Sequence, residues 1–464
     1  MLTYELGKKR GRPLYEQLYA AIKNDICLGK LQAWEKLPSK RDLARHLSVS
    51  VVTVENAYGQ LVAEGYISAK AKRGYYVLPG DRIAPPQPPP ASLPKPCQAK
   101  SDFLDLRSNS LSENDFPFSV WSKLMRKTMA DYGKQVLQST PAQGIEALRQ
   151  SIAAHLYQFR GMEVHYDDIV VGAGAEYLYN LLIQLLGRHH CFGVENPGYP
   201  KIGQIYRAND VAYANLPMDE AGLSLQHLRR SPADVIHISP SHHYPTGIVM
   251  PGRRRQELLA WASEQPGRYI IEDDYDSEFR FCDKPIAAMI SNDRQERVIY
   301  VNTFSKTISP AMRISYMILP PHLSRSFKQK LSFYSCTVPS LEQYTLAKFI
   351  QEGYFEQHIN RMKNKYQSKR DAIIAAIRES DLHTQADILE QNAGLHFLLR
   401  IHTDKSDREL VRRAEEAGLL IACLSQYVHG NAEKYAHHIV VNYSSLDFDQ
   451  IKPAVDKLAA VIRA

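Results

Sequence analysis

A proline-rich segment is the feature that most constrains how this chain folds. Residues 83–98 read IAPPQPPPASLPKPCQ, and seven of the chain's 26 prolines lie between Pro85 and Pro96. Proline has no backbone N–H and a fixed φ, so such a run favours an extended spacer over helix or sheet. We therefore predict a domain at residues 1–80, a linker at 81–100 and a second domain at 101–464.

The positive charge of the chain is concentrated before this linker. Residues 1–82 contain 14 Lys and Arg against 8 Asp and Glu, whereas the whole chain carries a formal net charge of only +7. The remaining residues are therefore almost neutral. A small basic head on a neutral body predicts an anionic partner for the head.

Several protein classes are not expected. The chain has no run of about 18 apolar residues that could cross a membrane. Its N-terminus lacks the basic and apolar regions of a signal peptide. The six cysteines are scattered, with no close pair at metal-ligand spacing. We expect a cytoplasmic protein with reduced thiols and without a metal site or membrane partner.

The head has the pattern of a winged helix-turn-helix. Apolar residues spaced four apart predict a helix over 14–28 that ends at Gly29. Ser39 and Ser50 stand at capping positions of two further helices, near 40–47 and 51–64. Two short strands, 66–69 and 75–78, flank the basic turn 70–74 and form the wing. In this fold the second of the paired helices enters the major groove of DNA.

The segments PSKRxLA at residues 38–44 and VSxxTVxxAYxxLxxEGY at 49–66 closely resemble the GntR family of bacterial regulators. The resemblance implies binding to double-stranded operator DNA. It implies contacts from the following residues: Lys40, Arg41, Ser50, Thr53, Arg73 and Gly74. One departure is Val51, where the family commonly has arginine, and Arg45 is the candidate substitute. The alternative is a protein-binding domain with a solvated basic face.

The body alternates buried strands with helices. Apolar, β-branched runs at 169–171, 235–238, 269–271 and 298–301 predict strands, and 177–186 and 254–264 predict helices between them. This alternation indicates an α/β fold with a mainly parallel sheet. The chain after about 392 mixes strands (396–400, 439–442) with helices (406–417, 448–462), as a smaller α+β terminal subdomain does.

Polar residues stand at the ends of these strands. Lys306 follows the strand 298–301, and a desolvated lysine there can form an imine with an aldehyde. Asp273 ends another strand, where a carboxylate can keep a pyridinium nitrogen protonated, as pyridoxal phosphate chemistry needs. The small residues Gly174 and Ala175, with Glu176, open a helix whose backbone N–H groups can bind phosphate. The alternatives are a surface lysine, a capping or metal-binding carboxylate and a turn needed only for packing.

The order of these motifs carries a second resemblance. GAE at 174–176, ENPGY at 195–199, PSHHYPTG at 240–247, DxY at 273–275, SK at 305–306 and Arg313 resemble fold-type I aminotransferases over about 350 residues. With the GntR-like head, the chain resembles the MocR/GabR group of regulators. The resemblance implies a homodimer that binds pyridoxal 5'-phosphate.

The resemblance also implies roles for single residues. Lys306 is the cofactor-binding lysine and the one catalytic residue, Asp273 pairs with the ring nitrogen, Tyr275 bonds the ring hydroxyl and Tyr199 stacks on the ring. The residues that bind the phosphate are those at the helix start, Gly174, Ala175 and Glu176, together with Thr303, Ser305 and Arg313. His242 takes the place of the aminotransferase asparagine that contacts the ring hydroxyl.

The substrate side departs from the aminotransferase pattern. Aminotransferases hold the substrate carboxylate with an arginine near the C-terminus, and Ser445 stands at that position. Members that sense γ-aminobutyrate use a second arginine where this chain has Lys201. We therefore expect a regulator that responds to pyridoxal phosphate itself, similar to the PdxR subgroup, and controls vitamin B6 synthesis.

Two alternatives remain at the level of sequence. One is a regulator of the same group that senses an amino acid or amine, held by Lys201, Arg400 or Arg107. The other is a working aminotransferase whose head is incidental. Residual transamination is compatible with any of these.

Overall fold

The structure is a computed structural model that describes residues 2–4, 6–7, 13–71, 73–79, 103–108, 115–281, 287–392 and 394–463. The chain forms two compact units, Met1–Lys100 and Ser101–Ala464. The predicted linker, residues 81–100, lies outside the described residues. Among the described helices, none is long and apolar enough to cross a membrane.

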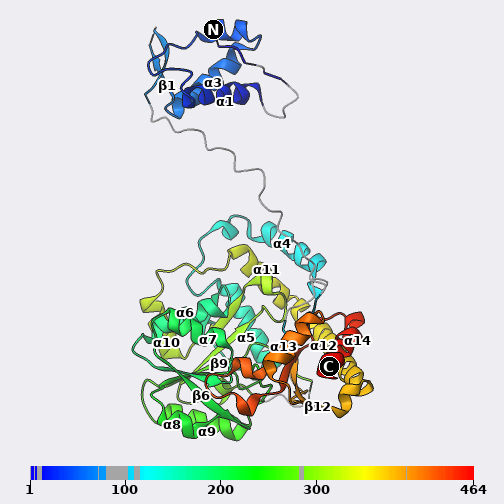
Figure 1. Ribbon diagram of the computed structural model, residues 1–464. Coiled ribbons are helices and arrows are strands. Elements are labelled where there is room, and N and C mark those ends of the chain that lie inside the picture. Colours follow the sequence, from blue (N-terminus) through cyan, green and yellow to red (C-terminus); the bar gives the residue numbers. More distant parts are fainter. Residues whose placement is uncertain are drawn as a thin grey trace. The chain divides into compact units, whose positions relative to one another are not determined.

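The described part of the N-terminal unit contains three helices and a two-stranded hairpin (Figure 1). Its elements are α1 (Leu14–Cys27), α2 (Lys40–His46), α3 (Val51–Ala63), β1 (Ile67–Lys70) and β2 (Gly74–Val77). The two strands pair antiparallel with Ile67 opposite Val77. The order matches the predicted winged helix-turn-helix, with each strand shifted by one residue from its predicted bounds.

Two serines begin the paired helices as predicted. Ser39 Oγ accepts a hydrogen bond from the N–H of Asp42 at 3.2 Å, and Ser50 Oγ accepts one from Thr53 at 3.1 Å. Each bond satisfies a backbone donor that the first turn of a helix leaves unpaired. The apolar faces of the helices meet the hairpin in one core, which includes the following residues: Leu18, Ile22, Leu43, Val54, Ala57, Tyr58, Leu61, Ile67 and Val77.

An eight-stranded sheet forms the centre of the C-terminal unit, in the order β4-β11-β10-β9-β8-β5-β6-β7. Its strands are β4 (Ile169–Gly172), β5 (Phe192–Asn196), β6 (Tyr213–Asp219), β7 (Gly222–Leu223), β8 (Val235–Ile238), β9 (Tyr269–Asp273), β10 (Val298–Thr303) and β11 (Ser315–Ile318). The neighbouring strands from β10 to β6 pair parallel, whereas β11 runs antiparallel to both β10 and β4. The predicted mainly parallel sheet is thus a large mixed sheet.

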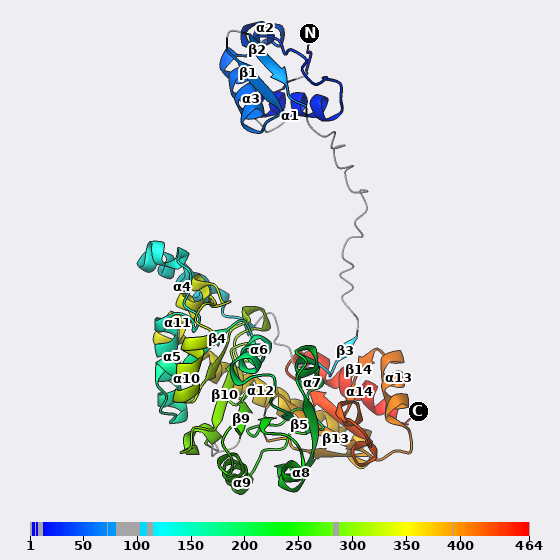
Figure 2. The ribbon, with the colours of Figure 1, turned by 90° about the vertical axis from the view of Figure 1, so that its left-hand side faces the viewer.

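Helices cover both faces of this sheet (Figures 1 and 2). They are α4 (Phe118–Tyr132), α5 (Glu146–Arg160), α6 (Ala175–Leu186), α7 (Pro200–Ala208), α8 (Leu225–Arg230), α9 (Gly252–Ser263), α10 (Pro321–Lys330) and α11 (Ser340–Gln351). Successive residues of a strand point to opposite faces. Val170 accordingly packs in one core with α6, and Val171 packs in another with α5.

A smaller subdomain completes the unit. Its four-stranded sheet has the order β12-β13-β16-β15. The elements are β12 (Ala386–Leu389), β13 (His396–Ile401), β15 (Ala422–Cys423), β16 (His438–Asn442), α12 (Tyr354–Glu379), α13 (Asp407–Glu416) and α14 (Phe448–Arg463). The segment after the linker joins it, because β3 (Leu104–Asp105) pairs parallel with β14 (Leu419–Leu420). The sequence did not predict this pairing.

Short 3₁₀ helices connect several of these elements. They are η3 (Gly133–Leu137), η4 (Tyr166–Asp168), η5 (Met289–Asn292), η6 (Pro310–Met312), η7 (Asp381–Thr384), η8 (Leu424–Tyr427) and η9 (Glu433–Tyr435).

Candidate functional site

A cavity of about 340 Å³ lies at the carboxyl ends of the parallel strands. Most of the predicted cofactor residues line it, namely Ala175, Glu176, Tyr199, Asp273, Tyr275, Thr303, Ser305, Lys306 and Arg313. Open α/β sheets bind ligands at this edge because the loops there converge. Gly174 and His242 are the two predicted residues that do not line the cavity.

Lys306 lies in the turn that follows β10. Its side chain is largely buried, and this burial lowers the pKa of its ammonium group, an effect that the carboxylate of Asp276 partly opposes. The turn is tied down because Thr303 Oγ1 accepts hydrogen bonds from the Ser305 N–H at 3.1 Å and from Ser315 Oγ at 2.8 Å. A lysine with a lowered pKa has a larger neutral, nucleophilic fraction at neutral pH.

Asp273 ends β9 with its carboxylate held from behind. Its Oδ2 accepts a hydrogen bond of 2.6 Å from the Tyr179 hydroxyl and lies 3.5 Å from His237 Nε2. The other ring nitrogen of His237 bonds Tyr206 at 2.8 Å. These groups orient the carboxylate toward the cavity that it lines, and a fixed carboxylate there suits a protonated ring nitrogen.

Two of these supporting residues were not predicted. His237 interrupts the otherwise apolar strand Val235–Ile238, and a histidine inside a buried strand is the signal that could have found it. Tyr179 lies inside the apolar pattern of α6, where nothing in the sequence distinguishes it from a packing residue.

Basic and acidic side chains meet at the start of α6. Arg313 Nη2 lies 3.3 Å and Lys201 Nζ 2.7 Å from the two carboxylate oxygens of Glu176. The Lys201 hydrogen bond is the main reason that the pKa of Glu176 is lowered. Gly174 has φ of 95°, and a Cβ atom there would lie 2.4 Å from the Arg313 guanidinium. The helix N-terminus and Arg313 together form an environment that suits a phosphate.

The structure places His243, rather than His242, on the cavity wall. The chain bends at His242, and the ring of this residue points away from the cavity. Its Nδ1 lies 2.9 Å from Asp276 Oδ2 and 3.3 Å from the Tyr275 hydroxyl. Gly394 provides the space for its ring, because a Cβ atom at 394 would lie 1.8 Å from His242 Cε1. His242 thus contacts Tyr275 from behind, and the next two residues, His243 and Tyr244, line the cavity.

The residues considered for holding a carboxylate differ in position. Ser445 donates to the backbone carbonyls of Asp105 and Ser108, at 3.2 and 3.0 Å. Arg107, between those two residues, lines the cavity. Arg400 pairs with Asp387 at the surface and is absent from the described cavity wall.

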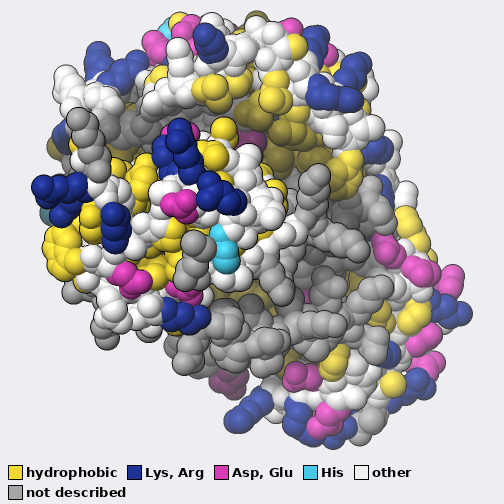
Figure 3. Space-filling view, turned by 90° about the horizontal axis from the view of Figure 1, so that it is seen from above, with side chains coloured by type: hydrophobic (Ala, Val, Ile, Leu, Met, Phe, Trp, Pro, Cys, Tyr) yellow, Lys and Arg dark blue, Asp and Glu magenta, His cyan; other side chains and the backbone are white. Residues whose placement is uncertain are grey.

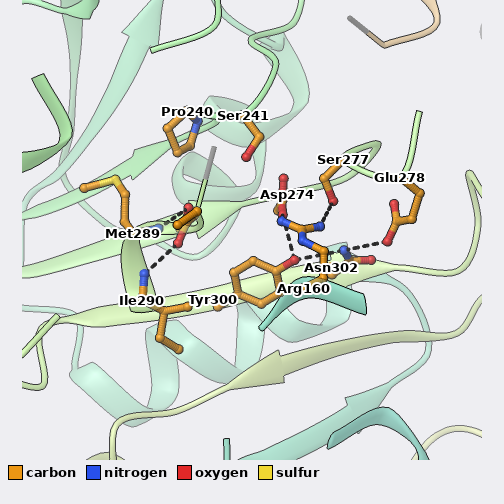
Figure 4. Close-up of polar contacts among 12 residues, drawn as sticks. Arg160, Pro240, Ser241, Asp274, Ser277, Glu278, Met289, Ile290, Tyr300 and Asn302 are labelled. Carbon is orange, nitrogen blue, oxygen red and sulfur yellow. Dashed lines mark hydrogen bonds and ion pairs between the residues drawn. The ribbon is translucent and has the colours of Figure 1, made fainter. Parts of the chain in front are cut away.

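A buried polar cluster lies behind the strand ends (Figure 4). Arg160 Nη2 lies 2.8 Å from Asp274 Oδ2, which also accepts a 2.7 Å hydrogen bond from the Tyr300 hydroxyl. Burial opposes ionisation of Asp274, but Arg160 and the hydrogen bond from the Tyr300 hydroxyl hold its pKa below the ordinary value. Asn302 Nδ2 donates to both Tyr300 and Glu278. Because Asp273 and Thr303 adjoin this cluster in sequence, it anchors two strand ends of the cavity.

Glu278 in this cluster predicts a pH dependence of stability. It is largely buried, and burial raises its pKa to about 7 from an ordinary 4.5, although Arg160 opposes the shift. Its contribution to stability is complete below about pH 4.5 and is lost as the pH rises through about 7. We expect the free energy of unfolding to fall from pH 5 to 8 by up to about 3 kcal/mol more in the wild type than in Glu278→Gln.

Urea unfolding at a series of pH values measures this difference. The exposed Glu220 provides a control, because Glu220→Gln should keep the wild-type pH profile. Equal pH slopes for wild type and Glu278→Gln would contradict the assignment.

Some of the residues predicted to contact DNA are exposed, and others are paired with neighbouring side chains. Arg41 and Arg73 are exposed, in α2 and at the wing turn. Lys40 pairs with Glu55 at 2.5 Å, Arg45 lies 3.7 Å from Asp42, and the Ser50 and Thr53 hydroxyls bond each other at 2.8 Å. Gly74 has φ of 108°, which favours glycine at the wing turn. Figure 3 shows Lys and Arg side chains gathered at several places on the visible face, among apolar and uncharged ones.

No group of three or more His, Cys, Asp or Glu among the described residues has the geometry of a metal site. The described cysteines are all free thiols: Cys27, Cys191, Cys336 and Cys423.

Comparison with known families agrees with both units. Residues 14–77 match the gntR family of bacterial regulatory proteins, and residues 101–458 match aminotransferase class I and II. The C-terminal fold is similar to a kynurenine aminotransferase of Pyrococcus horikoshii, with a TM-score of 0.69 and 24% identity over 78% of this chain and 91% of that one. This likeness concerns the fold.

Two full-length relatives combine the same parts. A probable rhizopine catabolism regulatory protein, MocR of Rhizobium meliloti, is 30% identical over 97% of this chain and 94% of its own. The pyridoxine biosynthesis transcriptional regulator PdxR of Corynebacterium glutamicum is 30% identical over 94% of this chain and 93% of its own. With a helix-turn-helix head, an aminotransferase-like body and relatives that share both, this chain belongs to the MocR group of GntR-family DNA-binding transcriptional regulators.

Proposed function

We propose that this regulator binds pyridoxal 5'-phosphate and responds to it, and that it controls genes of vitamin B6 synthesis. The observation that carries the proposal has two parts. The cavity wall contains the residues expected to hold the cofactor. Ser445, which stands where aminotransferases have the arginine for the substrate carboxylate, donates its hydroxyl to backbone carbonyls. The similarity to PdxR, a regulator of pyridoxine biosynthesis, supports the choice of target genes. The aminotransferase-like family and fold imply the same cofactor.

Nine residues of the wall would hold the cofactor. Lys306 would provide the amine for the aldehyde, and Asp273 would keep the ring nitrogen protonated. When bound, the cofactor would supply an electron sink. Tyr199 would cover the ring, and the Tyr275 hydroxyl would bond the ring oxygen. The backbone N–H groups of Ala175 and Glu176 would hold the phosphate together with a second set of residues: Thr303, Ser305 and Arg313.

The polar wall disfavours a tightly held amino-acid effector. Lys201 pairs with Glu176 at 2.7 Å, so a carboxylate there has to compete with an existing ion pair. Arg400 is occupied by Asp387. Arg107, by contrast, lines the cavity beside Ser445. An arginine in that position favours the second candidate, a regulator that senses an amino acid or amine.

The remaining organisation follows from the group. We propose a DNA-binding domain at 1–80, a linker at 81–100, an effector domain at 101–464 and a homodimer whose paired heads read two half-sites. A DNA-binding regulator acts on the chromosome, so we place the protein in the cytoplasm. The ligand acts by favouring one arrangement of the heads, which requires different affinities for the two arrangements.

Operator binding with and without pyridoxal phosphate tests the proposal. Duplexes enriched from a random pool by the full-length protein serve as probes, and fluorescence anisotropy at fixed salt measures affinity. We expect pyridoxal phosphate to change affinity about tenfold, within the usual range of allosteric coupling. Pyridoxal without its phosphate is the matched control and should have little effect.

Two results would contradict the proposal. One is a shift produced by an amino acid or amine but not by pyridoxal phosphate, which favours the second candidate. The other is multiple-turnover transamination without any specific DNA binding, which identifies an aminotransferase with an incidental head.

A further inference from the structure

Helix α3 exposes two valines where a DNA-reading helix meets the bases. Val51 and Val52 are its first two residues, with exposed fractions of 42% and 61%. The opposite face of the helix is buried in the core of the head through Val54, Ala57 and Leu61. The N-terminal residues of the second helix are the ones that contact base edges in helix-turn-helix proteins.

The helix lacks the side chains that read guanine. Its sequence, VVTVENAYGQLVA, contains no Lys, Arg or His. The commonest specific contact to G is a bidentate Arg or Lys bond to O6 and N7, so α3 cannot make it. Lys40, from the neighbouring α2, is held by Glu55 of α3 at 2.5 Å.

The polar groups of the first turn are also engaged. The Ser50 and Thr53 hydroxyls bond each other at 2.8 Å, and Ser50 Oγ caps the helix. Glu55 is also exposed, but it pairs with Lys40. The valine methyl groups and the exposed amide of Asn56 are the other groups that the first two turns offer to a partner. Both favour the same base pair, because an asparagine amide suits the N6 and N7 edge of adenine and an apolar side chain suits the thymine methyl group.

We infer that α3 reads A·T base pairs, with thymine C5-methyl groups packed against Val51 and Val52 and an adenine edge bonded by Asn56. The exposed Arg41 and Arg73 supply charge for the phosphates on either side. The net positive charge of the head matches duplex DNA rather than an apolar protein partner. The inference rests on DNA binding by the GntR-type head and is independent of the effector.

Thymine-to-uracil substitution tests the valine contacts directly, since it removes one methyl group and leaves base pairing intact. Full-length protein first enriches duplexes from a random pool, and its footprint locates the half-sites. We expect A·T pairs beneath α3 and a wild-type affinity about threefold to fourfold lower for each contacted thymine replaced by deoxyuridine. The double variant Val51→Ala/Val52→Ala withdraws the γ-methyl groups from both contacts, so it should bind the two duplexes more nearly equally than the wild type does.

Val62→Ala is the matched control. Val62 lies on the same helix with an exposed fraction of 37%, but near its C-terminal end. It should keep the wild-type preference for thymine over uracil. Asn56→Ala should lose about tenfold in affinity for the enriched duplex. Circular dichroism melting of each variant confirms that the head remains folded.

Three results would overturn the inference. They are G·C pairs enriched beneath α3, equal wild-type affinity for thymine and uracil duplexes, and valine variants that keep the thymine preference. A failure of the pyridoxal phosphate experiment would leave this readout unchanged, so the two proposals are tested separately.

Discussion

Replacing Lys306 with alanine is expected to abolish covalent attachment of pyridoxal phosphate. Lys306 follows β10, lines the cavity and has a pKa lowered by burial. A neutral amine at this point can attack the aldehyde, whereas alanine has no nucleophile. The visible absorption of a lysine-bound cofactor and, after borohydride reduction, the mass of the labelled peptide measure the attachment.

Lys201→Ala is the matched control, because Lys201 is a second lysine of the cavity wall, paired with Glu176. It should retain both the absorption band and the reduced label at Lys306. A band or label that persists in Lys306→Ala would remove Lys306 from its assigned role. The DNA affinity of Lys306→Ala should also become insensitive to pyridoxal phosphate, if attachment favours one arrangement of the heads.

Replacing Arg160 with methionine is expected to destabilise the C-terminal unit by about 3–5 kcal/mol, the range for breaking one partner of a buried ion pair. Methionine keeps the apolar volume but leaves the fully buried Asp274 without its cation, 2.8 Å away in the wild type. Chemical unfolding followed by tryptophan fluorescence measures the loss.

The loss of stability in Arg160→Met should also depend on pH. The wild-type pKa of Asp274 is held below its ordinary value, so its contribution to stability is present above about pH 4 and is lost as the pH falls. The gap between wild type and Arg160→Met should therefore narrow in acid. Arg253→Met is the control, since Arg253 is exposed over 92% of its side chain and should change stability little. A neutral result for Arg160→Met would show that the cluster is dispensable.

Local sequence patterns predict some parts of the fold and of the cavity better than others. The winged helix-turn-helix could be predicted because Ser39 and Ser50 cap their helices by bonds within three residues. The alternation of strands and helices in the body could also be predicted, since a buried strand needs apolar residues and little else. Asp273 and Lys306 could be placed at one edge because the ends of parallel strands converge.

Side-chain direction after the strands could not be predicted. The choice between His242 and His243 depends on the turn after β8 and on the space left by Gly394, more than 150 residues away. Arg107 reaches the cavity because Asn442 and Ser445 bond the backbone around it. Such contacts join distant segments and leave no periodic signal in either one.

The sequence alone therefore determined the two-part organisation, the family and most of the residues around the cavity. Those properties come from local spacing, from proline content and from the order of short motifs along the chain, all of which can be read without the fold. Tertiary structure decided which of two adjacent histidines lines the cavity, which arginine lies beside Ser445 and that Arg160 supports Asp274. Each of these depends on packing between segments far apart in the chain, where burial and charge pairing are settled only when the fold brings them together.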